Sequence, residues 1–202
     1  ACGFHAGDPV VMDHTIKLAK KFNVAIGAHP GYLDLMGFGR RKMELTYNEV
    51  KCYIKYQIGA LKTFVESEGL NLQHVFLHGA LNSAAAKIED IATGVIEGIK
   101  EIDEKLIFLH RPHLLSYEVA KNRGLDVATV IGIDTDYTIE GLAVPQRKKK
   151  KISPTDAALK AVQLVKEKKL KTVEGQYLSI DVDSILIHGD TPNSVSVLKK
   201  IH

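Results

Sequence analysis

Apolar residues recur at intervals of three and four along several segments of the chain, which is the spacing of one face of an amphipathic helix. Start signals precede three of these segments: Asp8-Pro9, the capping-box sequence Thr46–Glu49, and Ser153-Pro154. A glycine follows the second segment at Gly69 and suits a helix end. The pattern therefore predicts helices over residues 9–21, 46–67, 81–100, 113–122, 153–168 and 191–200.

Short apolar or β-branched runs separate these helices, and they are typical of buried strands. A weaker run at 175–178 suits an irregular or edge piece. Strands that alternate with helices through short connections predict an α/β fold, with a parallel sheet and the helices outside it. The expected strands cover residues 24–29, 74–79, 106–110, 126–133 and 184–188, and the chain opens on the end of an apparent further strand.

The apolar runs share an ending, because each of five stops at a histidine with glycine or proline within two residues. Loops at the carboxyl ends of parallel strands build active sites, and histidine is the usual general base and a common metal ligand. A single histidine at the end of a strand is equally well explained as a structural residue at the rim of the sheet. Their repetition favours a barrel or near-barrel with one shared imidazole-rich pocket. The predicted members of this pocket are His5, His29, His78, His110 and His188.

The segment after His29 is the most unusual of the chain. Its next twelve residues hold three glycines together with Asp34, Arg40 and Arg41. The glycines and charged side chains of such a loop contribute little to a hydrophobic core, but the loop can bend around a small anion and present charge to it. Adjacent loop residues rarely both point inward, so Arg41 alternatively lies in solvent beside Arg40.

Composition narrows the class of protein without identifying it. The 202 residues are 45% hydrophobic and 25% charged, as in an ordinary globular protein, and we expect a single domain over 1–202. A net charge of +3 gives no argument for nucleic acid, and the two cysteines make no disulfide framework. Without a long apolar run or a leader pattern, we expect a cytoplasmic enzyme with no membrane partner. The start without Met, on the end of a strand, suggests that a segment precedes Ala1.

Several longer motifs carry a resemblance to a known family. The chain contains no GxGxxG after a strand and no GxxxxGK[ST], so no dinucleotide or P-loop site is predicted. The motifs ACGFHAGDP (1–9), IGAHPGYLDLMGFGRRKM (26–43), YQIGAL (56–61), HGAL (78–81), EGLAVPQR (140–147) and HGDTPNSV (188–195) resemble the LamB/YcsF family, the A subunits of bacterial-type 5-oxoprolinase.

The resemblance implies a fold and an activity. The fold is an imperfect seven-stranded (β/α) barrel of the polysaccharide-deacetylase and glycoside-hydrolase type, here apparently lacking its N-terminal strand. The activity is ATP-dependent hydrolysis of the cyclic amide 5-oxoproline (pyroglutamate) to L-glutamate, together with subunits B and C. Members of the family are thought to act on a lactam activated with their partners, which agrees with the missing ATP loop.

The same resemblance and the chemistry of amide hydrolysis suggest roles for individual residues. A general base must deliver water to the carbonyl carbon, and cations must hold anionic groups of the substrate. Asp34 is expected to orient His29 or Arg40, while Asp8 and Asp190 are alternatively helix caps. The catalytic candidates are His5, Asp8, His29, His78 and His188, with a divalent metal possible at His5, His29 or His78. The substrate-binding candidates are Asp34, Arg40, Arg41, Asp134, Tyr137 and Asp190.

The chain departs from the family pattern at three positions. Phe76 replaces a lysine, Asn82 replaces a tyrosine, and Thr135 replaces an arginine, while lysines 148–151 follow where a glycine-containing loop is usual. The lysine run is expected to be solvated. These changes keep two alternatives open: a non-catalytic, degenerate paralogue, and a metal-dependent deacetylase or other carbohydrate-active enzyme.

Overall fold

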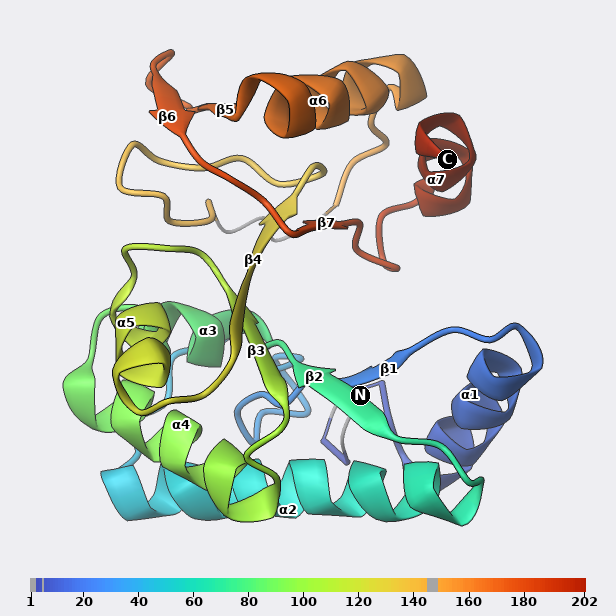
Figure 1. Ribbon diagram of the computed structural model, residues 1–202, viewed down its shortest axis with the longest axis vertical. Helices are drawn as coiled ribbons and strands as arrows, with labels where there is room; N and C mark the ends of the chain where they lie inside the picture. Colours follow the sequence, from blue (N-terminus) through green and yellow to red (C-terminus); the bar gives the residue numbers. More distant parts are fainter. Residues whose placement is uncertain (1–2, 5, 145–148) are drawn as a thin grey trace. The chain divides into compact units, whose positions relative to one another are not determined.

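The computed structural model describes residues 3–4, 6–144 and 149–202, in which helices and strands largely alternate in an α/β fold (Figure 1). No helix in these ranges is long and apolar enough to cross a membrane. The elements are α1 (Pro9–Lys21), β1 (Ile26–Ala28), α2 (Tyr47–Ser67), β2 (Leu72–Val75), α3 (Gly79–Ala85), α4 (Glu89–Ile102), β3 (Ile107–His110), α5 (Leu115–Asn122), β4 (Val127–Gly132), α6 (Pro154–Glu167), β5 (Lys169–Lys171), β6 (Tyr177–Ser179), β7 (Ser184–Leu186) and α7 (Ser194–Ile201).

Most predicted elements are confirmed, and the start signals act as expected. The side chain of Thr46 accepts from the Glu49 amide while Glu49 reaches back to Thr46, which completes the capping box of α2. The single helix predicted over 81–100 is wrong, because the chain forms α3 and then α4. The break follows from the acidic residues Glu89 and Asp90, which favour the first turn of a new helix.

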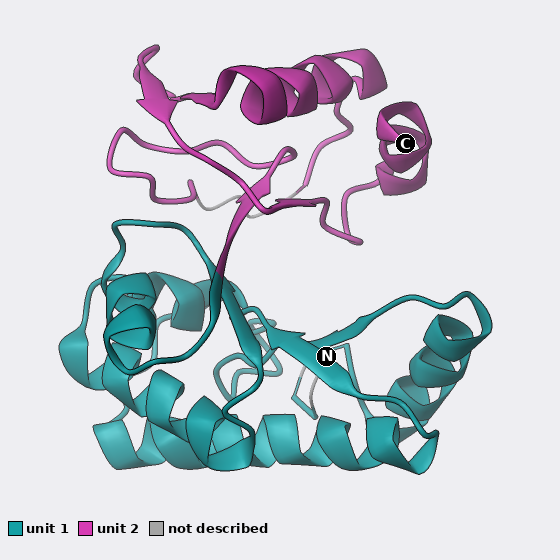
Figure 2. Ribbon diagram, in the orientation of Figure 1, with its two compact units in different colours: residues 1–127 teal, residues 128–202 magenta. Residues whose placement is uncertain are grey.

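The chain divides into two compact units, residues 1–127 and 128–202, which Figure 2 shows in different colours. The expectation of one domain over 1–202 stays a prediction. In the first unit β1, β2 and β3 run parallel, with Ala28 opposite Val75 and Val75 opposite Phe108. Helices α2 and α4 pack against one another and bury their apolar faces in the core of this unit. The strands thus hold their carboxyl ends together at one edge.

The second unit contains two separate strand pairs. Strand β4 pairs in parallel with β7, with Gly132 opposite Leu186. The weak run at 175–178 belongs to an antiparallel pair of β5 and β6 that lies outside the parallel ladder. The described strands include this antiparallel pair beside the parallel ones, and the seven-stranded barrel of the deacetylase type stays a prediction for this chain.

His110 ends β3 but belongs to the core of the first unit and not to a pocket. Its side chain is 0% exposed, its ring stacks on Phe108 at 5.5 Å, and neither ring nitrogen has a hydrogen-bond partner in the described residues. Burial, helped by the Arg111 charge, lowers the pKa of His110 to about 3. The ring is therefore neutral at pH 7, and the prediction of one pocket for all five histidines is wrong for this one.

Because His110 is buried, we expect the free energy of unfolding to fall in acid. Between pH 6.5 and 3 the unfolded chain binds a proton at His110 that the folded chain excludes, so folding weakens as pH drops. In the parent protein this effect lowers the free energy of unfolding by about 2 kcal/mol at pH 5 and by almost nothing at pH 7. We expect His110→Phe to remove this loss. Urea unfolding at both pH values measures it, with the exposed His14→Phe as the control. An identical pH dependence in His110→Phe and the parent protein would contradict the assignment.

Candidate functional site

His29 and His78 form a pair at the strand ends of the first unit. His29 follows β1 directly and His78 lies three residues beyond β2, so the register of Ala28 with Val75 brings them together. Nε2 of His29 lies 3.0 Å from Nδ1 of His78. The other ring nitrogens face main-chain carbonyls, Nδ1 of His29 at 2.6 Å from Phe76 and Nε2 of His78 at 2.7 Å from Phe38.

The carbonyl partners determine where the hydrogens of this pair lie. A carbonyl oxygen only accepts, so both outer ring nitrogens carry hydrogen and donate. The two inner nitrogens then form a hydrogen bond only if the pair holds one further proton, which makes it an imidazole–imidazolium pair with one positive charge. Each ring thus fastens the chain: His29 to the segment after β2, and His78 to the glycine-rich loop.

The described residues do not fit a catalytic metal at this pair. Zinc in a catalytic site takes three protein ligands. His29 and His78 could turn only their inner nitrogens towards an ion, and the described part of the chain contains no cluster of three His, Cys, Asp or Glu residues able to hold one. His5, the third metal candidate, lies outside the described residues. A metal-dependent reaction therefore gains no support from this donor set.

Asp34 is the centre of the loop that follows His29. Its carboxylate accepts from the Gly37 amide at 2.8 Å and from Nε of Arg41 at 2.9 Å, and it pairs with the Arg41 guanidinium. The hydrogen bonds from Arg41 outweigh partial desolvation and lower the pKa of Asp34 to about 2. The prediction that Asp34 orients His29 or Arg40 is wrong, because Arg41 folds back onto it and closes the turn. Arg40 instead lies over the Phe38 ring at 5.3 Å.

Removing the Arg41 charge tests this internal ion pair. We expect Arg41→Met to raise the pKa of Asp34 from about 2 towards its ordinary 3.8, because Arg41 is the main cause of the shift. In the parent protein the stabilisation from Asp34 is present above pH 4 and is lost as pH falls towards 2. Carboxyl carbon NMR across this range measures the pKa. Arg40→Met is the matched control, and an equal shift in that variant would contradict the pairing.

Backbone contacts and one buried glutamine fix the loop to the rest of the unit. Gln57, on the apolar face of α2, accepts from the Gly31 amide and donates to the Gly31 carbonyl, both at 2.9 Å. The Ala80 amide donates to the Gly39 carbonyl at 2.9 Å. Gln57 was not among the predicted site residues, although it stands in the YQIGAL motif. A polar residue within an apolar stripe was the available signal.

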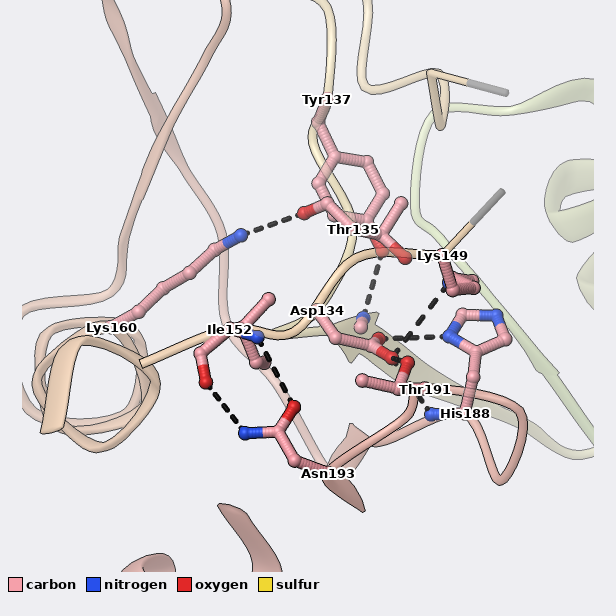
Figure 3. A network of polar contacts seen from close by, with 10 residues as sticks. Asp134, Thr135, Tyr137, Lys149, Ile152, Lys160, His188, Thr191 and Asn193 are labelled. Carbon is pink, nitrogen blue, oxygen red and sulfur yellow. Dashed lines mark hydrogen bonds and ion pairs between the residues drawn. The ribbon is translucent and has the colours of Figure 1, made fainter. Parts of the chain in front are cut away.

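Asp134 and His188 form the second cluster, within the second unit (Figure 3). Each lies two residues beyond the facing pair Gly132 and Leu186, so the parallel register places them opposite one another. The Asp134 carboxylate accepts from Nδ1 of His188 at 2.8 Å, from the His188 amide at 3.1 Å and from the Thr191 hydroxyl at 2.5 Å. Thr191 was not predicted, although it stands in the HGDTPNSV motif.

These contacts fix both the charge of Asp134 and the tautomer of His188. Burial opposes ionisation of Asp134, but hydrogen bonds from His188 and Thr191 outweigh it and hold its pKa well below the ordinary range. An ionised carboxylate only accepts, so Nδ1 of neutral His188 carries the hydrogen and Nε2 presents its lone pair. The His188 side chain is 32% exposed while Asp134 is 0% exposed. A buried carboxylate that orients an accessible imidazole is the arrangement of a general base.

Three further polar residues surround Asp134 in Figure 3. The ammonium of Lys149 lies 3.8 Å from Oδ2 of Asp134, and its side chain is only 11% exposed, so the expectation of a fully solvated lysine run is wrong here. The Tyr137 hydroxyl accepts from the Gly132 amide at 2.8 Å, inside the unit. Lys160 donates to the Thr135 carbonyl at 2.7 Å, and burial lowers its pKa. Tyr137 thus supports the turn after β4, and its role in substrate binding stays a prediction.

Asp8 and Asp190 are further predicted site residues that the structure describes. Asp8 caps α1, accepting from the Val10 and Val11 amides at 3.0 and 3.1 Å, so the helix-cap expectation is confirmed and a catalytic role stays a prediction. Asp190 is exposed, and the N-cap of α7 is Asn193, so the expectation that Asp190 caps this helix is wrong. The end of the EGLAVPQR motif, residues 145–147, lies outside the described ranges.

Comparisons with known proteins agree with the motifs. The chain matches the LamB/YcsF family over residues 1–202. It is 45% identical to the 5-oxoprolinase A subunit of Thermococcus sibiricus over 98% of this chain and 78% of the relative, and 46% identical to that of Pyrococcus furiosus with the same coverage. The crystal structure of a lactam utilization protein from Thermus thermophilus superposes with a TM-score of 0.90 at 35% identity, covering 99% of this chain and 81% of that one. The chain belongs to the LamB/YcsF family.

Proposed function

We propose that this chain hydrolyses the cyclic amide of 5-oxoproline to L-glutamate, in an ATP-dependent reaction shared with partner subunits B and C. The Asp134–His188 pair is the observation that carries the proposal, because it is an oriented base of the kind that amide hydrolysis needs. Relatives of this family that are 40–46% identical are named as the A subunit of 5-oxoprolinase, which supports the choice of a lactam as substrate.

In the proposed reaction His188 accepts a proton from water at Nε2 while the water oxygen attacks the carbonyl carbon of the lactam. Asp134 stays ionised and stabilises the imidazolium that forms through its contact with Nδ1. The imidazolium then gives its proton to the ring nitrogen of the substrate as the carbon–nitrogen bond breaks. Thr191 and the His188 amide hold the carboxylate in place throughout.

ATP would transfer a phosphoryl group to the amide oxygen, releasing ADP and making the carbonyl carbon a better electrophile. Breakage of the carbon–nitrogen bond would then leave an acyl phosphate, and its hydrolysis by a second water would give L-glutamate and phosphate. The sequence carries no P-loop for the nucleotide, so we assign its binding to the partner subunits. Use of ATP also fits the cytoplasmic location that we propose. In the first unit, we assign the His29–His78 pair to holding the loop of Asp34 and Arg41, since its outer nitrogens are bound to main-chain carbonyls.

A reconstituted reaction tests the proposal. The chain, preceded by any upstream segment that its gene encodes, is combined with B and C subunits, 5-oxoproline and ATP, and the release of glutamate and phosphate is followed. We expect glutamate only when the chain and ATP are both present. A complex that assembles but releases no glutamate would contradict the proposal and favour the non-catalytic paralogue.

A further inference from the structure

Lys149 differs from the lysines that follow it in the same run. Lys150 and Lys151 are more exposed, whereas the Lys149 side chain is 11% exposed and reaches the Asp134 carboxylate (Figure 3). Withdrawing a lysine from water has a cost that a nearby negative charge offsets. Lys149 therefore has surroundings that Lys150 and Lys151 lack, although the sequence alone does not distinguish these lysines.

The contact with Asp134 leaves the donors of Lys149 largely unused. Its ammonium stands 3.8 Å from Oδ2, which is beyond hydrogen-bonding distance. The two carboxylate oxygens already accept from Thr191 and from two groups of His188. The negative charge of Asp134 thus holds the ammonium in place, while its N–H groups are not consumed by that carboxylate.

We propose that Lys149 is the anion-binding residue of the Asp134–His188 site. It would hold a negatively charged oxygen group of the substrate beside the His188 base, either the carboxylate of the lactam or the phosphoryl group of its activated form. An ammonium is a compact charge with three donors and binds both groups. Lys149 and Nδ1 of His188 both contact the Asp134 carboxylate, at 3.8 and 2.8 Å (Figure 3), which places the cation near the base. This inference rests on the proposed function and adds a residue to it.

Binding to the chain alone tests the role of Lys149 without turnover. Calorimetric titrations with 5-oxoproline, inorganic phosphate and the uncharged lactam 2-pyrrolidinone are compared for the parent protein, Lys149→Met, Lys149→Arg and the matched exposed variant Lys150→Met. We expect Lys149→Met to weaken binding of one or both anions about 10- to 100-fold, because a charge-assisted hydrogen bond is lost. Lys149→Arg should retain much of the affinity, and Lys150→Met should leave it unchanged.

The pattern of losses identifies the group that Lys149 holds. Weaker binding of 5-oxoproline with unchanged 2-pyrrolidinone assigns it to the carboxylate, and weaker binding of phosphate alone assigns it to the phosphoryl group. Equal losses in Lys149→Met and Lys150→Met, no loss in Lys149→Met, or no anion binding by the parent protein would each overturn the proposal. Thermal unfolding of each variant separates a binding defect from misfolding.

The titrations and the turnover assay test two separate claims, and either claim can be rejected without the other. A parent complex that releases no glutamate, in a chain whose anion binding depends on Lys149, would reject the hydrolase function and leave the anion site standing. A complex that releases glutamate at the same rate and with the same KM in Lys149→Met would reject the role of Lys149 and leave the hydrolase function standing.

Discussion

Asp134→Asn is expected to lower kcat for glutamate release by about three to four orders of magnitude, as the equivalent change does where a buried aspartate orients a catalytic histidine. The asparagine amide can donate towards Nδ1 of His188, which then accepts and leaves the hydrogen on Nε2. The ring would face the substrate in the wrong tautomer, and the imidazolium would lose its neighbouring negative charge. Steady-state turnover in the complex with B and C subunits measures the loss.

Asp136→Asn is the matched control for this change, because Asp136 is exposed and lies two residues along the same loop. It should retain kcat within about threefold, in line with the small effects of ordinary surface substitutions. A folded Asp134→Asn variant with parental kcat would show that Asp134 only supports the turn after β4. It would also remove the reason for assigning His188 as the base.

Gly79→Ala is expected to have the largest effect on the first unit. Gly79 opens α3 with φ of +53°, and a Cβ there would lie 2.6 Å from the Gly39 carbonyl oxygen. That carbonyl accepts from the Ala80 amide, so relief of the clash would displace the glycine-rich loop and strain the bond from His78 to Phe38. We expect a loss of about 2–4 kcal/mol in the free energy of unfolding, from backbone strain and overpacking together.

Gly124→Ala separates the two causes. Gly124 also has positive φ, +72°, but a Cβ there meets nothing within 4 Å. It should cost about 1–2 kcal/mol, the price of the left-handed backbone alone. Urea unfolding of both variants at pH 7 gives the difference, which reports the contact with Gly39. If the two variants lose equal stability, α3 and the loop do not pack as closely as described.

The two functional clusters differ in how far the sequence could predict them. The rule that parallel strands meet at their carboxyl ends correctly brings His29 to His78 and Asp134 to His188, because each pair follows strands that are neighbours in one ladder. It fails for His110, which is the last residue of β3 and is buried in the core, whereas His29, His78 and His188 all lie beyond the ends of their strands. The side on which a strand-end residue points depends on register, and a one-residue difference reverses it.

Partners within loops were the least predictable feature. Asp34 binds Arg41 and not Arg40 because a tight turn through Gly37 returns the chain to the carboxylate, and two adjacent arginines in a sequence give no sign of which one will do so. Lys149 was read as one of four equivalent lysines, and only the folded position of Asp134 distinguishes it. The helices, whose caps are local signals, were predicted closely, apart from the break before α4.

The central claim, that His188 is the base for lactam hydrolysis, is tested most directly by comparing His188→Ala with His29→Ala in the reconstituted complex. We predict that His188→Ala lowers kcat for ATP-dependent glutamate release by at least about 1000-fold, no less than Asp134→Asn, because proton transfer is lost. His29→Ala should retain more activity, since His29 only fastens the chain near the loop. Parental turnover by His188→Ala, with activity abolished in His29→Ala, would contradict the account and place the base in the first unit.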